Sequence, residues 1–181
     1  MLVERIIMGI DPGTHVMGYG VVKETGAKME LLQYGVLQLS VYPSLALKLQ
    51  HIYQHTLEIL RAYHPDEIAF EAPFYGKNVQ SMLKLGRAQG VAMAAALMCE
   101  IPITEYAPRK VKQAVTGNGN ASKEQVAYMV ASILQLPDTP TQLDSSDALA
   151  VAICHIYQRT RPTTGKQDWK QAIQARGLTV I

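Results

Sequence analysis

The order of predicted strands and helices constrains the fold of this chain more than any other feature of its sequence. Residues 5–10 are apolar and β-branched and end at the turn Asp11-Pro12-Gly13, a pattern that predicts a first strand. A second strand is predicted over residues 19–22, paired with the first as a hairpin, and a third over residues 29–39. The chain is therefore expected to begin with a small antiparallel sheet.

Helices and strands alternate after this point. Apolar residues at helical spacing predict a helix over residues 44–63 that Pro65 ends. The further predicted elements are a strand over 67–72, a helix rich in small residues over 79–99, a strand over 101–106, and helices over 110–115, 122–136 and 143–158. This order is typical of an α/β domain. No repeat or linker divides the chain, so we expect one domain over residues 1–160 and a basic, polar tail over residues 161–181.

The composition excludes several classes of protein. Of the 181 residues, 48% are hydrophobic and 18% are charged, which excludes a mainly disordered chain. The two cysteines, Cys99 and Cys154, are too few for a disulfide-stapled scaffold, and we expect both to be buried thiols in a reducing compartment. The N-terminus does not have the pattern of a signal peptide, and no apolar run reaches the roughly 20 residues of a membrane span. A cytoplasmic protein with no membrane role is expected.

The charges are segregated along the chain. The totals are nearly balanced, with 17 Lys and Arg against 15 Asp and Glu. Residues 72–123, however, contain seven basic and two acidic residues, and residues 159–176 contain five basic and one acidic residue. Separate basic segments suit a polyanionic partner such as nucleic acid. Solvated helix faces would explain the same pattern about as well.

Four carboxylates stand near the ends of predicted elements. Asp11 follows the first strand, and Glu71 lies near the end of the fourth. Asp144 and Asp147 are three residues apart at the start of the last helix and therefore share one face of it. If the first and fourth strands are neighbours, their ends bring Asp11 and Glu71 together. A helix start packed at that edge would add the other two carboxylates.

Such a cluster favours metal-dependent chemistry. Carboxylates in one cleft raise one another's pKa unless a cation neutralises them. Mg²⁺ or Mn²⁺ prefers oxygen ligands and keeps positions open for water and phosphate oxygens. Two ions about 4 Å apart could activate a water and stabilise the departing oxygen of a phosphodiester. The cluster therefore predicts phosphodiester hydrolysis.

Each acidic residue also has a purely structural interpretation. Asp144 could cap the last helix, and Asp11 could initiate a turn. Asp147 could interact favourably with the positive end of the helix dipole. Glu71 is harder to explain in this way because it interrupts an apolar strand. The prediction of a metal site therefore depends on the whole set.

Five segments, in order, resemble the RuvC family of bacterial Holliday-junction resolvases. They are GIDPGT at residues 9–14, GYGV at 18–21, IAFE at 68–71, KLGRAQG at 84–90 and DSSDALA at 144–150. This resemblance implies a ribonuclease H-like fold, in which a five-stranded mixed sheet carries helices on both faces. It also implies a homodimer that binds four-way DNA junctions and makes paired, symmetric nicks with Mg²⁺, or Mn²⁺ in its place, at two ions per site. The RuvA–RuvB branch-migration complex is an implied partner.

The resemblance also implies roles for individual residues. Asp11, Glu71, Asp144 and Asp147 match metal-binding, catalytic carboxylates. Phe74 matches an aromatic residue that inserts near the junction crossover, where an exposed ring can stack on a base. Lys112 and Lys123 match basic residues close to the cleaved strand, where they would bind phosphate and assist catalysis. Further candidate DNA contacts are Tyr75, Lys77, Lys84, Arg87, Arg109 and Lys110.

The two-fold symmetry of a four-way junction suits a closed dimer with two identical sites. The helix over residues 79–99 is the candidate interface, because its small side chains permit close packing.

Other functions remain open at this point. The GIDPGT segment with a Gly-rich hairpin also resembles the first phosphate loop of actin-like ATPases and sugar kinases. Those proteins enclose a nucleotide between two lobes, whereas 181 residues supply one. The main alternative is another ribonuclease H-like nuclease that cuts a different branched DNA or an RNA substrate. A catalytically inactive DNA-binding relative would not need the full acidic set.

Three histidines have spacings that suggest a site. His15 lies four residues after Asp11, and His51 and His55 have the i, i+4 spacing of a metal pair. No third ligand is evident near that pair. We interpret all three as surface residues.

Overall fold

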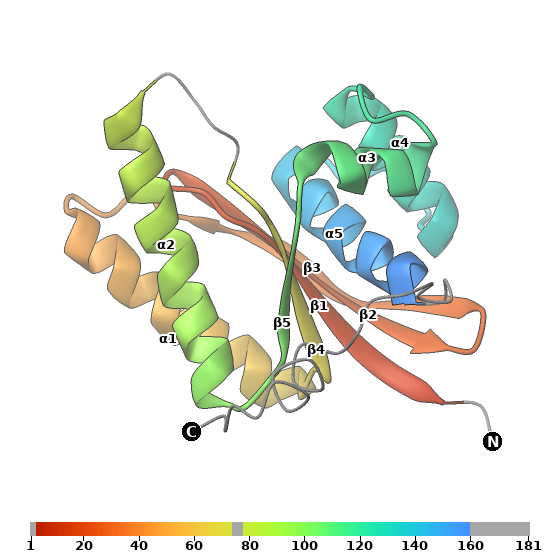
Figure 1. The fold of residues 1–181 in the computed structure, drawn as a ribbon, viewed down its shortest axis with the longest axis horizontal. Helices are drawn as coiled ribbons and strands as arrows, with labels where there is room; N and C mark the ends of the chain where they lie inside the picture. The colour runs from red at the N-terminus through yellow and green to blue at the C-terminus, as the bar shows by residue number, and fades with distance from the viewer. Residues whose placement is uncertain (1–2, 74–77, 160–181) are drawn as a thin grey trace, which may run out of the picture.

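Five strands form one mixed sheet in the computed structural model, which describes residues 3–73 and 78–159 (Figure 1). The strands are β1 (Glu4–Asp11), β2 (Val16–Thr25), β3 (Lys28–Gln38), β4 (Glu67–Glu71) and β5 (Ile103–Tyr106). Their order across the sheet is β3-β2-β1-β4-β5. The β1–β2 and β2–β3 pairs are antiparallel, whereas β4 runs parallel to both β1 and β5. The predicted N-terminal antiparallel sheet is confirmed.

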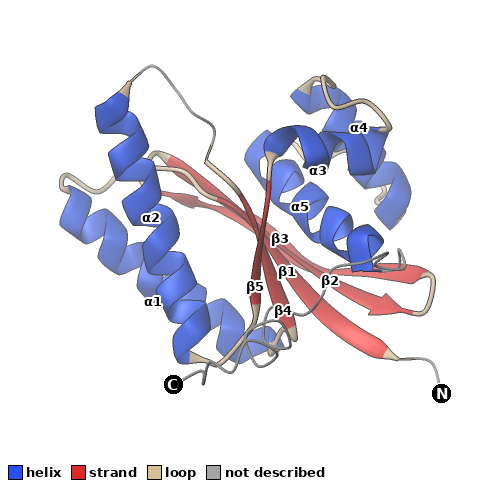
Figure 2. Ribbon diagram, in the orientation of Figure 1, coloured by secondary structure: helices blue, strands red, loops and turns tan. Residues whose placement is uncertain are grey.

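Helices cover both faces of this sheet (Figure 2). One face carries α1 (Leu45–Tyr63) and α2 (Val79–Met98), and the other carries α3 (Pro108–Thr116), α4 (Lys123–Leu134) and α5 (Leu143–Arg159). This arrangement confirms the predicted ribonuclease H-like architecture.

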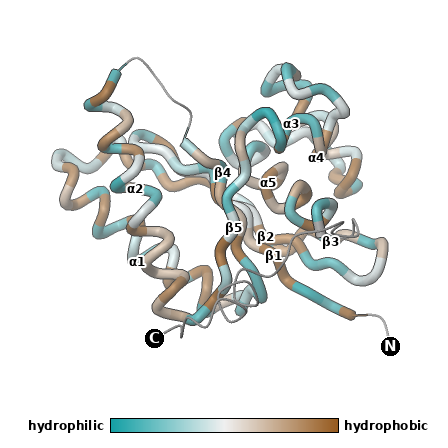
Figure 3. Tube along the Cα trace, viewed as in Figure 1, coloured by the Kyte–Doolittle hydropathy of each residue, from teal (hydrophilic) through white to brown (hydrophobic). Residues whose placement is uncertain are grey.

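The two layers of helices create two hydrophobic cores, one on each side of the sheet. Side chains alternate along a strand, so Ile7 packs in the core beneath α5, and the next residue, Met8, packs in the core beneath α1 and α2. In β4, Ala69 and Phe70 are divided between the two cores in the same way. Figure 3 shows hydrophobic and hydrophilic stretches alternating along α1 and α2, as expected for helices that cover a sheet on one side.

Most predicted elements are present, with differences at their ends. The last strand begins at Ile103 instead of residue 101, because the Ile101 amide donates to Ala96 O at the end of α2 and Pro102 has no amide hydrogen for a ladder. The short helix begins at Pro108, two residues early, since proline is well tolerated in the first turn of a helix. Ser122 caps α4 as predicted, with Gln125 completing a capping box.

The two cysteines differ in exposure. Cys154 in α5 is buried, as expected, but Cys99 is exposed. The prediction for Cys99 was wrong because this residue is the C-cap of α2, where the helix has passed beyond the core that buries its middle. None of the helices within the described ranges is long and apolar enough to cross a lipid bilayer. The predicted tail over 161–181 lies outside the described residues, so the domain boundary at residue 160 stays a prediction.

Candidate active site

Asp11 and Glu71 are brought together by the parallel pairing of β1 and β4. Ile10 pairs with Phe70 in this register, and each carboxylate is the next residue and the last of its strand. Parallel neighbours end at the same edge of a sheet. Both side chains therefore lie at this edge, as expected, and both line a cavity of about 230 Å³.

Helix α5 brings Asp144 and Asp147 to the same edge by packing very closely on the sheet. Gly9 in β1 and Gly18 in β2 make this approach possible, since a Cβ at Gly9 would overlap the carbonyl oxygen of Ala148 and a Cβ at Gly18 would overlap that of Asp144. With glycine at these positions, the first turn of α5 lies directly over the ends of the strands.

Three aspartates form a group that could hold a metal ion. Carboxylate oxygens of Asp11, Asp144 and Asp147 all lie within 4.8 Å of one another. Glu71 is not part of this close group, but it lines the 230 Å³ cavity with Asp11 and Asp147. The structure therefore places all four predicted carboxylates at one edge, with three close enough to share an ion and Glu71 in the adjoining cavity.

Burial and mutual repulsion raise the pKa of Asp11, Glu71 and Asp147. Burial is the largest cause for Asp11, whose pKa is well above its ordinary value, and the charges of Glu71 and Asp147 add to the effect. Burial also dominates for Glu71, where the charge of Asp147 helps to raise the pKa to about 7. The pKa of Asp147 is raised by burial too, although Lys123 opposes the shift. A site with this pattern favours cation binding.

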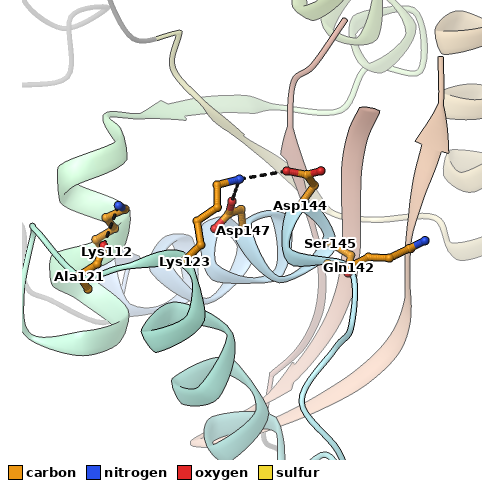
Figure 4. Close-up of polar contacts among 7 residues, drawn as sticks. All are labelled: Lys112, Ala121, Lys123, Gln142, Asp144, Ser145 and Asp147. Carbon is orange, nitrogen blue, oxygen red and sulfur yellow. Dashed lines mark hydrogen bonds and ion pairs between the residues drawn. The ribbon is translucent and has the colours of Figure 1, made fainter. Parts of the chain in front are cut away.

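The two predicted lysines differ in what they contact (Figure 4). Lys123, the first residue of α4, places Nζ 3.0 Å from Asp144 Oδ1 and 2.7 Å from Asp147 Oδ2. Burial alone would lower the pKa of Lys123, but its hydrogen bonds to Asp147 and Asp144 outweigh this and raise the pKa above its usual range. Lys112 lines the same cavity, yet its Nζ donates to Ala121 O at 2.7 Å, in the loop before α4.

The remaining basic candidates lie on helix surfaces. Lys84 and Arg87 are exposed on α2, and Arg109 and Lys110 are exposed on α3. Lys110 Nζ lies 5.0 Å from the centroid of the Tyr106 ring. The other three predicted DNA contacts, Phe74, Tyr75 and Lys77, lie outside the described residues.

The histidines singled out in the sequence do not join the carboxylates. His15 is exposed and lines a separate cavity with Lys48 and Lys84. The rings of His51 and His55 stack with their centroids 6.0 Å apart. Both residues are half-buried and their rings also contact Tyr42 and Tyr19, so the interpretation as surface residues holds only in part for this pair.

The sequence analysis missed a buried histidine. His155 in α5 is 3% exposed; its Nδ1 lies 2.9 Å from Tyr106 Oη, and its Nε2 lies 2.9 Å from Glu67 Oε2. These contacts connect α5 with β4, the strand that ends at Glu71, and with its neighbour β5. A single histidine within an apolar helix gives no local signal of such partners.

The metal-free protein should lose stability as the pH rises from about 4.5 to about 7. The folded-state pKa of Glu71, about 7, exceeds its ordinary value of 4.5, so the folded protein keeps a proton that the unfolded chain has already released. This difference corresponds to a loss on the order of 3 kcal/mol. Urea unfolding in EDTA at pH 5 and pH 7.5 measures it.

Glu71→Gln is the matched control for this pH dependence, because the amide cannot titrate. The buried His155, whose pKa is lowered by burial, acts in the opposite sense in both proteins and cancels in the comparison. Equal pH dependence in the wild type and in Glu71→Gln would contradict the shift.

Comparison with known proteins identifies the family. The family model described as crossover junction endodeoxyribonuclease RuvC matches residues 7–155. The RuvC protein of Christiangramia forsetii is 59% identical over 163 residues, covering 90% of this chain and 85% of that relative. The RuvC protein of Bacteroides fragilis is 55% identical over 174 residues, covering 94% of this chain and 93% of that relative.

Solved structures agree with this match. The structure of Thermus thermophilus RuvC in complex with Holliday junction substrate superposes with a TM-score of 0.80 at 35% identity, covering 86% of this chain and 94% of that chain. The yeast mitochondrial Holliday junction resolvase Ydc2, at 13% identity and a TM-score of 0.59, covers 82% of this chain and 77% of that chain and shares the fold. The match to the RuvC family assigns the chain to nucleases and not to actin-like ATPases. The chain belongs to the RuvC family of crossover junction endodeoxyribonucleases.

Proposed function

We propose that this protein resolves four-way DNA junctions by two symmetric nicks, using Mg²⁺ or Mn²⁺ at two ions per site. The observation that carries this proposal is the grouping of Asp11, Asp144 and Asp147 within 4.8 Å, with Glu71 in the adjoining cavity. Carboxylate oxygens are the ligands that these hard ions prefer. The similar Thermus thermophilus protein was solved with a Holliday junction substrate.

In this proposal the four carboxylates bind the ions and the lysines bind the scissile phosphate. Bound divalent ions supply the activation of water and the stabilisation of the departing oxygen. Lys123, at the mouth of the acidic group, and Lys112, in the cavity wall, provide positive charge for the scissile phosphate. The exposed Lys84, Arg87, Arg109 and Lys110 suit the neighbouring backbone phosphates.

A labelled synthetic four-way junction, incubated with and without Mg²⁺ beside a linear duplex and an RNA–DNA hybrid, tests this function. We expect paired nicks at symmetric positions only in the junction and only with Mg²⁺. Cleavage of the hybrid in preference to the junction would overturn the proposal and favour a different ribonuclease H-like nuclease.

A homodimer that uses α2 as its interface is part of the proposal. Buried residues on one face of α2 include Ala88, Ala92 and Ala95, yet four large apolar side chains of this helix are exposed. Those four are Val79 at 67%, Leu83 at 51%, Leu97 at 57% and Met98 at 74% exposure. The exposed Gly86, Gly90 and Ala94 would let a second helix approach closely.

Leu83→Glu should convert the dimer to a monomer. A carboxylate in the centre of an apolar interface should cost about 2 kcal/mol or more, or roughly a 30-fold weaker association. Sedimentation equilibrium measures this, with Val41→Glu as the control because Val41 is exposed outside α2. A Leu83→Glu protein that stays dimeric would rule out this interface.

Two further parts of the proposal come from family membership. The RuvA–RuvB branch-migration complex is the expected partner, which co-purification would test. The cytoplasm is the expected location, since that is where a bacterial chromosome offers four-way junctions.

A further inference from the structure

The ammonium group of Lys123 lies where a cation of the acidic site would lie. Its Nζ is 3.0 Å from Asp144 Oδ1 and 2.7 Å from Asp147 Oδ2, and both aspartates belong to the group whose oxygens lie within 4.8 Å of one another. Figure 4 shows the side chain reaching across from the start of α4 to bridge the two residues. Lysine thus supplies positive charge to two of the three aspartates.

The backbone that carries Lys123 is fixed in place from two sides. Ser122 and Gln125 form a reciprocal capping box, with Gln125 N donating to Ser122 Oγ at 3.2 Å and Ser122 N donating to Gln125 Oε1 at 2.9 Å. Lys112 Nζ donates to Ala121 O at 2.7 Å, which joins the residue before the Ser122 cap to α3. The backbone position of Lys123 is therefore built into the fold, and Lys112 helps to hold it.

The side chain of Lys123, unlike its backbone, can move away from the two aspartates. The Lys123 side chain is 49% exposed, and its four-carbon stem is flexible. An ion that binds Asp144 and Asp147 through the same oxygens at about 2.1 Å would lie within a few ångströms of the ammonium. Two cations at that separation repel strongly in a partly buried site.

We propose that Lys123 is a resident counter-cation of the metal site, and that a divalent ion must displace it from Asp144 or Asp147 in order to bind. This inference rests on the metal site of the proposed function. The lysine holds the carboxylates together in the metal-free enzyme and weakens the affinity of the free enzyme for metal. The displaced ammonium then becomes available to a phosphate of bound DNA.

Mn²⁺ binding to the DNA-free protein, followed by electron paramagnetic resonance of the free ion, tests the competition without any activity measurement. Lys123→Met removes the charge but keeps an unbranched side chain, and it should bind Mn²⁺ about tenfold more tightly than the wild type. Lys28→Met is the matched control, because Lys28 is exposed at the start of β3, at the opposite end of the sheet from the carboxylates, and the Mn²⁺ affinity of this variant should stay within about twofold of the wild type. Equal or weaker Mn²⁺ binding by Lys123→Met would overturn the proposal.

Thermal unfolding gives a second measurement in the event that Lys123→Met is unstable without metal. The melting temperature of this variant should fall in EDTA and rise on addition of Mn²⁺ by more than that of the wild type. An equal Mn²⁺-induced rise in both proteins would contradict the competition. Asp11→Asn separates the two levels of inference: if it binds Mn²⁺ as the wild type does, the proposed metal site itself fails, whatever Lys123→Met shows.

Discussion

Asp144→Asn is expected to slow junction cleavage by about 1,000-fold or more while junction affinity stays within about threefold of the wild type. Asp144 contributes an oxygen to the three-aspartate group and is bridged to Asp147 by Lys123. The amide keeps the shape of the side chain but removes the negative charge that a divalent ion needs, so the loss falls on chemistry. Single-turnover cleavage and gel-shift binding of the same labelled junction measure the two quantities.

Asp138→Asn is the matched control for this change. Asp138 is an exposed aspartate in the loop between α4 and α5, so the same substitution there should leave both quantities unchanged. A parallel loss of binding and cleavage in Asp144→Asn would count against a metal-binding role and in favour of a structural one.

Gly18→Ala is expected to destabilise the protein by about 3 kcal/mol and to abolish most cleavage. The added Cβ would overlap the carbonyl group of Asp144 and approach Ser145 N to 3.2 Å. These are backbone atoms, which a rotamer change cannot move, so the first turn of α5 must shift away from β2. Asp144 and Asp147 would then move away from Asp11. Urea unfolding and junction cleavage measure the two effects.

Gln54→Ala provides the comparison for this variant. Gln54 is exposed in the interior of α1, outside the acidic edge and outside α2, and alanine is slightly favoured over glutamine in a helix. This control should be neutral or slightly stabilising. Unfolding free energies of Gly18→Ala and Gln54→Ala that agree would show that α5 tolerates the displacement.

Local pattern was sufficient for most elements of the fold. The apolar, β-branched run of β1 and the helical spacing of α1 are set by neighbours along the chain, and both elements formed within one or two residues of the predicted bounds. The second strand, predicted over residues 19–22, is longer and spans Val16–Thr25. Two other errors occurred where contacts beyond the local pattern decided the end of an element. The Ile101 amide is taken by the end of α2, and the exposure of Cys99 depends on where α2 leaves the core.

The acidic site could be predicted in part. The sequence marked Asp11, Glu71, Asp144 and Asp147 by their positions at element ends, and in the structure all four lie at one edge of the sheet. Asp11 and Glu71 meet because β1 and β4 are neighbours in the sheet. The local sequence around each carboxylate does not specify that pairing. The sequence also did not distinguish the contacts of the two lysines. Lys112 donates to a backbone carbonyl, whereas Lys123 bridges two aspartates.

The sequence by itself thus determined the order of the elements, the residues able to bind a hard cation, and the resemblance to a nuclease family. Only the tertiary structure decided which of those residues touch, how closely α5 approaches the sheet at Gly9 and Gly18, and that His155 pairs with Tyr106 and Glu67. The physical reason is the separation along the chain between the residues that interact. Strand and helix periodicity arise from nearby residues, whereas the distance between two carboxylates far apart in the chain depends on the packing of whole elements.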